Sequence, residues 1–241
     1  MTPAMRTRRK PCLTLTLTLL LAVAGCRVPP MARTPVLKPP GQAGATLFQL
    51  DADASQIRLY LRADGPLARL GHSHVITSHG LQGKIWVQTQ LERSSCELQL
   101  PVSTLMVDDP QERALAGGEF SKPLDDDARA GTREHMLSDR QLDALHFPLL
   151  LLRCQGVTRT AEGVLLNLTV KLRGHESALS VPVTWQLTGS TLQASGDFTV
   201  TQTGLGMEPY SALFGALRVA DEIRAQFLMV ARAREPGAIG F

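Results

Sequence analysis

Hydrophobic and polar residues alternate with a period of two through much of this chain. In one such segment Ile57, Leu59 and Leu61 are separated by polar or aromatic neighbours. The same alternation covers residues 81–87, 96–102, 166–173, 179–186, 192–200 and 223–229. Strict alternation is typical of β-strands with one buried and one solvent-facing side. Turn residues separate several of these segments, so the pattern favours an antiparallel meander that closes on itself and removes its edges.

The stretch from Asp108 to His146 breaks this alternation. It is acidic and rich in glycine, and the run Asp125–Asp127 is typical of a solvated loop, because it lacks the spacing of a calcium-binding loop. Residues 134–145 carry apolar residues at helical spacing, and Ser138 or Asp139 is placed to cap a second short helix. Another strand starts at Phe147. The sequence therefore predicts an all-β antiparallel, lipocalin-like barrel of about eight strands with a short helical insert before the middle strands.

The first 25 residues have the order of a secretory signal: a basic cluster, a short apolar run and small residues. The small residues end at Cys26, which resembles the site of lipid attachment in bacterial lipoproteins. The alternative is an ordinary secretory signal with a cysteine there by chance. We expect a signal over 1–25, a lipid anchor and proline-rich tether over 26–46, the barrel over 47–234 and a tail over 235–241. Lipidated Cys26 would hold the protein to a membrane on the periplasmic side of the cell envelope.

The residue after that cysteine is Arg27. By resemblance to other lipoproteins, the lack of an aspartate there favours the outer membrane over the inner one. The chain has 25 Lys and Arg against 22 Asp and Glu, and the four basic residues of the first 25 positions leave the remainder with a net charge of −1. The remainder therefore has no basic footprint for nucleic acid.

Three pieces, in order, resemble the YceI-like family of bacterial periplasmic barrels. They are residues 133–152, the two strands over 166–183 with the turn Arg173–Gly174, and residues 196–206 with the final strand from Asp221. The resemblance covers roughly Phe48 to Ala233. It implies a lipocalin-like barrel around an elongated apolar cavity, which in related proteins holds a polyisoprenoid chain. This chain departs from the family pattern in a longer acidic insert over 112–130 and in the histidines of Gly71–Ile76.

Strand parity and this resemblance together predict a lumen lined by inward-pointing apolar side chains. These are Ile57, Leu59, Ile85, Leu98, Leu152, Leu168, Val170, Val183, Trp185, Phe198 and Phe227. We expect this lumen to bind an apolar lipid, such as a polyisoprenoid, for sequestration or transport. The alternative is a structural protein in which these side chains form a filled core. Catalytic motifs such as Gly-x-Ser-x-Gly, the P-loop and His-Glu-x-x-His are absent from the sequence, so we expect no enzyme.

Two pairs of residues carry further chemistry. His72 and His74 would share one strand face, where two imidazoles can ligate a metal or sit beside a haem, as in a redox module. No third ligand has suitable spacing, so we expect polar lining instead of a metal or haem cofactor. Cys96 and Cys154 both fall on the apolar parity of their strands. An oxidising compartment favours a disulfide between them, and two buried free thiols are the alternative.

Overall fold

The computed structural model describes residues 44–234, and these form a β-barrel with a helical insert. The strands are β1 (Thr46–Leu50), β2 (Gln56–Asp64), β3 (His74–Ser78), β4 (Gln82–Val87), β5 (Ser95–Pro101), β6 (Met106–Val107), β7 (Leu149–Arg159), β8 (Val164–Leu172), β9 (His175–Thr188), β10 (Thr191–Thr201), β11 (Ser211–Ala212) and β12 (Leu217–Ala233). The expected signal, Cys26, most of the tether and the tail lie outside the described residues. Among the described residues, no helix is both long and apolar enough to cross a membrane.

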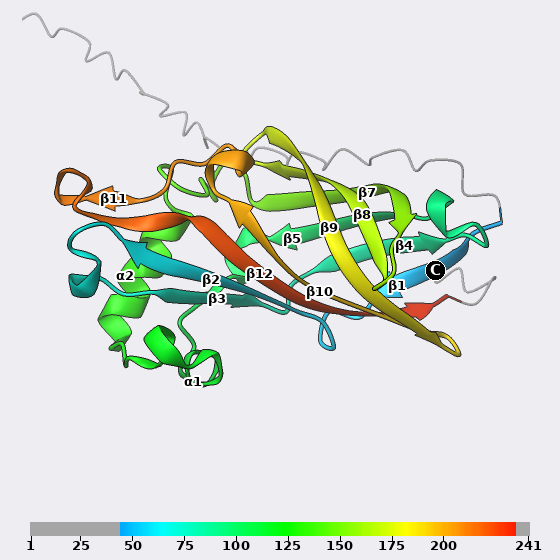
Figure 1. Cartoon of the computed structure of the whole chain (residues 1–241), viewed down its shortest axis with the longest axis horizontal. Helices are drawn as coiled ribbons and strands as arrows, with labels where there is room; N and C mark the ends of the chain where they lie inside the picture. Colours follow the sequence, from blue (N-terminus) through cyan, green and yellow to red (C-terminus); the bar gives the residue numbers. More distant parts are fainter. Residues whose placement is uncertain (1–43, 235–241) are drawn as a thin grey trace, which may run out of the picture. The chain divides into compact units, whose positions relative to one another are not determined.

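Eight strands close into the barrel. Successive neighbours run β1-β4-β5-β7-β8-β9-β10-β12, all antiparallel, and β12 returns to pair with β1. Figure 1 shows these strands wrapping around a common interior. The alternating segments found in the sequence correspond to β2, β4, β5, β8, β9, β10 and β12, and β7 begins two residues after Phe147. The all-β barrel of about eight strands is therefore confirmed.

Three of the strands around the barrel are broken into collinear pairs. Along the long strand β12, β1 pairs near the C-terminal end (Phe48 opposite Ala233), while β2 pairs further back (Leu61 opposite Ile223). The next two pairs are arranged in the same way. Strand β3 pairs with β2 and β6, whereas β4, which follows it in the chain, pairs with β5. The path of paired strands in the described part ends at β6, so the wall opens at the end formed by β2, β3 and β6.

The insert between β6 and β7 packs at this open end. It holds α1 (Pro110–Ala116) and α2 (Asp126–Leu137) (Figure 1). Asp109 caps α1 by accepting hydrogen bonds from two backbone amides of the first turn, and Pro110 occupies the first helical position, where its missing N–H costs nothing. Asp125 caps α2 by accepting a hydrogen bond from the backbone amide of Ala128. Short 3-10 turns complete the chain: η1 (Ala68–Leu70), η2 (Leu91–Arg93), η3 (Val102–Thr104), η4 (Gly118–Ser121), η5 (Thr203–Leu205) and η6 (Leu213–Gly215).

The helical insert was expected, but its boundaries differ from the prediction. The predicted helix over 134–145 ends at Leu137, and Ser138 is its C-cap instead of starting a second helix. The run Asp125–Asp127, expected to be a solvated loop, begins α2. The reason is electrostatic, since carboxylates stabilise the positive end of a helix dipole. Residues 138–146 fold back as turns, which places Leu142 in the core.

The core lies inside the barrel and is mainly aliphatic. Leu98, Leu100 and Val102 are each no more than 6 % exposed, as are Val181 and Val183 across the interior. Cys96 and Cys154 lie directly opposite each other on β5 and β7, and the structure joins them in a disulfide. The bond ties two neighbouring strands of the barrel wall together from the inside.

Candidate ligand-binding site

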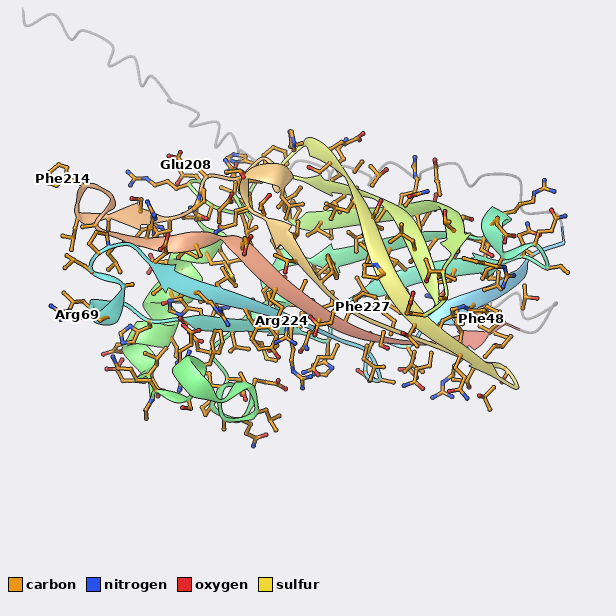
Figure 2. All side chains as sticks on the ribbon, viewed as in Figure 1. Phe48, Arg69, Glu208, Phe214, Arg224 and Phe227 are labelled. Carbon is orange, nitrogen blue, oxygen red and sulfur yellow. A yellow bond between two sulfur atoms is a disulfide. The ribbon has the colours of Figure 1, made fainter. Side chains whose placement is uncertain are left out.

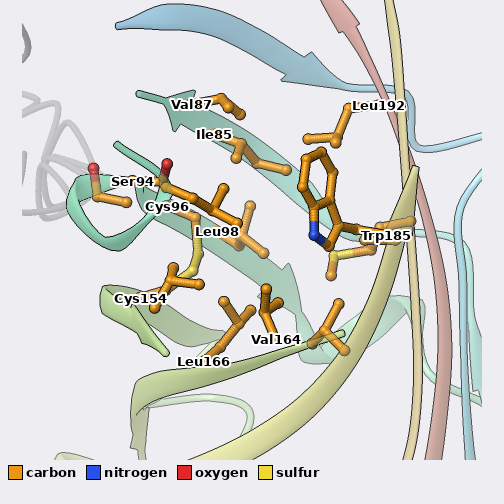
Figure 3. Close-up of a pocket in the computed structure, with 16 residues that line it drawn as sticks. Ile85, Val87, Ser94, Cys96, Leu98, Cys154, Val164, Leu166, Trp185 and Leu192 are labelled. Atoms are coloured by element: carbon orange, nitrogen blue, oxygen red, sulfur yellow. A yellow bond between two sulfur atoms is a disulfide. The ribbon is translucent and has the colours of Figure 1, made fainter. Parts of the chain in front are cut away.

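An apolar cavity of about 80 Å³ lies inside the barrel, at the end near the disulfide. Strands β4, β5, β7, β8, β9, β10 and β12 all contribute side chains to its lining. Figure 3 shows Trp185 and Leu192 on one side, with the Cys96–Cys154 disulfide across from them. An apolar cavity of this kind attracts hydrocarbon and offers water no partner.

The structure places the predicted lumen residues in three settings. Ile85, Leu98, Val183 and Trp185 line the apolar cavity itself. Ile57, Leu59, Leu152 and Leu168 pack against the same core cluster further along the barrel. Phe198 and Phe227 pack against a second cluster, with their rings edge to face at 6.4 Å between centroids, and Val170 is buried.

Many inward-facing side chains are only partly buried. Ile57, Leu59, Leu152 and Leu168 keep intermediate exposure, although strand parity directs them to the interior. In a close-packed interior, such aliphatic residues are fully buried. The barrel therefore holds its interior side chains less tightly than a filled core does.

A larger hollow of about 360 Å³ lies at the open end of the barrel, and we call it the mouth pocket. It lies between α2 and strands β2, β3 and β12. Its lining residues are Leu61, His74, Ile76, Gly131, Thr132, His135, Met136, Gln141, Gln202, Tyr210 and Val219. Leu61, Ile76 and Met136 belong to the hydrophobic cluster that also lines the apolar cavity through Leu98 and Leu192, so one continuous apolar core connects the two hollows.

His74 projects toward the mouth pocket from the first residue of β3. Its Nδ1 lies 2.6 Å from Oδ2 of Asp108, whose side chain is completely buried. Asp108 follows β6 in a left-handed backbone conformation (φ 55°), which aspartate adopts more readily than most residues. Its other oxygen accepts hydrogen bonds from the backbone N–H of Val75 and from Arg113 Nη1, at 2.9 and 2.5 Å.

This buried group is electrostatically balanced. Burial by itself raises the pKa of Asp108, but hydrogen bonds and charge from His74, together with the Val75 amide and Arg113, outweigh it and lower the pKa below its usual value. Arg113 also donates to the backbone carbonyls of Ser73 and Lys122, at 2.7 and 2.8 Å. The carboxylate thus fixes the orientation of the His74 ring and joins β3 to α1.

His135 lies on α2, on another wall of the mouth pocket. Its ring meets that of Tyr210 edge to face, with 4.5 Å between centroids. The Nε2 atom of His135 is buried and has no hydrogen-bond partner in the protein. Gln141 and Gln202 use their amide nitrogens to donate to backbone carbonyls. The mouth pocket therefore presents imidazole, hydroxyl and carboxamide groups, and its lining in the described structure contains no Lys, Arg, Asp or Glu.

His72 does not share a strand face with His74, so that prediction is wrong. Strand β3 begins only at His74, because the preceding residues form a loop, and His72 lines a separate surface pocket with Lys122 and Arg113. Burial lowers the pKa of His72, and the nearby positive charges of Lys122, His74 and Arg113 lower it further. The described residues contain no group of three or more His, Cys, Asp or Glu side chains placed to hold a metal ion.

Asp108, Arg113 and Tyr210 were not singled out from the sequence. The only local signal was Asp109-Pro110 after a short apolar strand, which marks a helix start. Tyr210 comes from a distant hairpin, so no spacing in the sequence links it to His135. These three residues could therefore be assigned to the site only from the three-dimensional structure.

No protein-family model matches this chain, and no curated protein matches it. Solved structures do match. BcnA from Burkholderia cenocepacia superposes with a TM-score of 0.56 at 11 % identity, over 75 % of this chain and 98 % of that one. A polyisoprenoid-binding domain from Saccharophagus degradans gives 0.51 at 11 % identity, over 78 % and 98 %.

A mutant of the CJ YCEI protein gives a TM-score of 0.50 at 8 % identity, over 66 % of this chain and 85 % of that one. The class that fold and site define is an up-and-down antiparallel barrel with a hollow apolar interior and a helical insert at its mouth. Within that class, the chain has the YceI-like fold, which confirms the resemblance seen in the sequence.

Proposed function

We propose that this protein binds one apolar lipid chain inside the barrel, with an uncharged polar head group in the mouth pocket. The observation that carries the proposal is the loose interior, in which inward aliphatic side chains such as Leu59 and Leu168 stay partly exposed beside an apolar cavity. A polyisoprenoid suits this interior because it is long, flexible and free of polar atoms. One of the structural neighbours is described as a polyisoprenoid-binding domain, which supports the same ligand class.

The volumes of the two hollows determine how the lipid chain must lie in the barrel. The apolar cavity encloses about 80 Å³, whereas sites for drug-sized ligands usually enclose about 300–1,000 Å³. The mouth pocket, at about 360 Å³, falls in that range. The ligand therefore enters through the mouth pocket, and its chain displaces loosely held side chains on its way to the cavity near Trp185.

The chemistry of the mouth pocket determines the head group. A phosphate or carboxylate head would normally meet lysine or arginine, and neither lines this pocket among the described residues. The buried Nε2 of His135 lacks a partner, and an alcohol or amide can supply one. We therefore assign the pocket to a lipid alcohol in preference to its phosphate ester.

We further propose that the protein works in the cell envelope, anchored through lipidated Cys26, where it sequesters or carries the lipid. The support for this is the order of basic, apolar and small residues before that cysteine. The binding role requires no chemistry, so we propose a binding protein and not an enzyme.

The test is native mass spectrometry of the chain purified from its host, followed by organic extraction and identification of any released lipid. We expect a stoichiometric lipid with a long apolar chain. Ala194 lines the cavity, so Ala194→Leu should fill it and reduce the bound lipid. The matched control is Gln193→Leu, which adds a leucine to the exposed outer face of the same strand. A folded protein that never carries lipid would support the filled-core alternative.

A further inference from the structure

The hairpin between β11 and β12 carries the most exposed large apolar side chain among the described residues. Phe214 is fully exposed at its turn, and Leu213 is 60 % exposed. In the neighbouring loop after β2, Leu70 is 63 % exposed. The two loops are joined where the Leu67 amide donates to the Ala216 carbonyl at 2.8 Å. We call Leu70, Leu213 and Phe214 the apolar tip, and Figure 2 shows Phe214 at the far end from Phe48.

The backbone turn that points Phe214 outward is conformationally strained. Leu213 and Phe214 have φ values of 51° and 56°, in the left-handed region that residues with a Cβ rarely occupy. Glycine would adopt this turn without strain. A turn that places two large apolar residues where glycine fits best, and then exposes them to water, gains nothing for the stability of the domain. Strain of this kind is typical of segments that serve binding.

The same hairpin also forms part of the mouth pocket. At its base, Val219 donates its backbone N–H to the Tyr210 carbonyl at 2.9 Å, and both residues line the pocket. Tyr210 in turn packs against His135. One short element therefore connects the apolar tip to the place where a ligand would enter.

We propose that the apolar tip inserts into a lipid bilayer and places the mouth pocket against the membrane surface. Three side chains are too few for a stable protein interface, which buries at least about 1,000 Å² in total. They suit the shallow apolar layer beneath lipid head groups. The charges nearby agree with this surface: Arg218 is neutralised by Asp64, while exposed Arg69 forms none of the ion pairs found in the described residues.

The proposal of membrane insertion depends only on the apolar tip. The further idea that insertion serves to load lipid rests on the proposed function. The test uses the full chain with Cys26→Ala in every variant, so that no acyl chain contributes and residues 1–43 are otherwise identical. Flotation with vesicles of phosphatidylcholine and phosphatidylglycerol measures binding. We expect Phe214→Gly to weaken vesicle binding by about tenfold, while its thermal midpoint stays the same or rises because the turn is relieved of strain.

The matched control is Leu187→Ser, because Leu187 is an exposed leucine beside the β9–β10 turn, at the opposite end of the barrel. It should leave vesicle binding unchanged. Equal binding by Phe214→Gly and its parent would overturn the proposal, as would a tip-dependent dimer in sedimentation without vesicle binding. If vesicle binding depends on Phe214 but no lipid is ever extracted from the parent protein, the membrane tip stands and the lipid-binding function fails.

Discussion

The Nδ1 of His74 and the Oδ2 of Asp108 lie 2.6 Å apart, although 34 positions separate the two residues in the sequence. The contact joins the first residue of β3 to the loop that begins the helical insert. It gives His74 a carboxylate partner where the sequence suggested a second imidazole. The insert is therefore attached to the barrel wall by a buried charged group, at the edge of the mouth pocket.

Replacing Asp108 by asparagine should destabilise the protein strongly. The change would leave Arg113, only 4 % exposed, without its counter-charge. Breaking a buried ion pair from one side typically costs about 3–5 kcal/mol. Urea unfolding measures the loss. The control is Asp197→Asn, which breaks the exposed pair with Arg224 and should cost less than about 1 kcal/mol. Equal losses in the two variants would contradict the role given to Asp108.

The same variant tests a pH dependence. The pKa of Asp108 is lower in the folded protein than its usual value of 3.8. The folded state therefore favours the carboxylate, and this contribution is complete above the unfolded pKa and is lost as pH falls through the lower, folded one. The free energy of unfolding should decrease from about pH 4 downward. The decrease should be shallower in Asp108→Asn, because that side chain no longer titrates.

Loss of the Cys96–Cys154 disulfide should destabilise the barrel by about 2–4 kcal/mol, because the bond closes a long loop, with a sequence separation of 58. Urea titrations with and without a thiol reductant measure the difference. The double variant Cys96→Ala with Cys154→Ala should have the reduced stability under both conditions. A parent protein that does not respond to reductant under unfolding conditions would contradict this expectation.

Two additions of volume should have opposite results. Val170 is 4 % exposed and is not among the residues that line the cavity, so Val170→Phe should cost about 1–3 kcal/mol through overpacking. Ala194 lines the cavity, so Ala194→Leu should leave the free energy of unfolding unchanged or raise it by about 1 kcal/mol. Denaturant titration of ligand-free protein compares them. A similar cost for both would mean that the space at Ala194 cannot accept a side chain.

His135→Phe should separate stability from head-group binding. Phenylalanine keeps the ring contact with Tyr210 and removes the unpaired Nε2, so the ligand-free protein should be as stable as the parent or slightly more stable. Affinity for farnesol should fall by about fivefold, the value of one hydrogen bond. Farnesyl phosphate, which meets no Lys or Arg among the lining residues that the structure describes, should bind weakly to both proteins. Calorimetry with the two ligands measures this, and an unchanged affinity for farnesol would exclude Nε2 from the site.

Cys26→Ala should prevent acylation, so the acylated N-terminal peptide should be lost and membrane association should fall to the level that the apolar tip alone supports. Fractionation followed by mass analysis of the N-terminal peptide measures both effects. Membrane association that persists unchanged in this variant, without vesicle binding by the apolar tip, would contradict the lipoprotein proposal.

The fold could be read from the sequence because alternation reports the inward face of each strand directly. Ile57, Leu98 and Val183, which strand parity and the family resemblance directed to the interior, pack in its hydrophobic clusters. Strand β1 was missed as a separate element because its five residues are too few to establish a period. The breaks that divide β1 from β2 and β3 from β4 were also missed, since alternation says nothing about where a strand bends.

The site was harder to predict than the fold. Cys96 and Cys154 could be paired by compartment and parity, but their direct opposition depends on the register of β5 and β7. The mouth pocket gathers His74, His135 and Tyr210 from three separate elements, and no local pattern brings them together. His72 was misplaced because the strand was predicted to begin at Gly71, three residues before β3 begins at His74, which is the usual uncertainty in a strand boundary.

The last strand holds the whole wall together, and this sets the order in which the protein can fold. Strand β12 pairs with β10 along one edge and with β1 and β2 along the other. Until the chain reaches Ala233, β1 can pair only with β4, and a chain that stops before Leu217 leaves β1, β2 and β10 with open edges. Pairing across such a long sequence separation is slow. The barrel can therefore close only when synthesis has nearly reached the end of this strand.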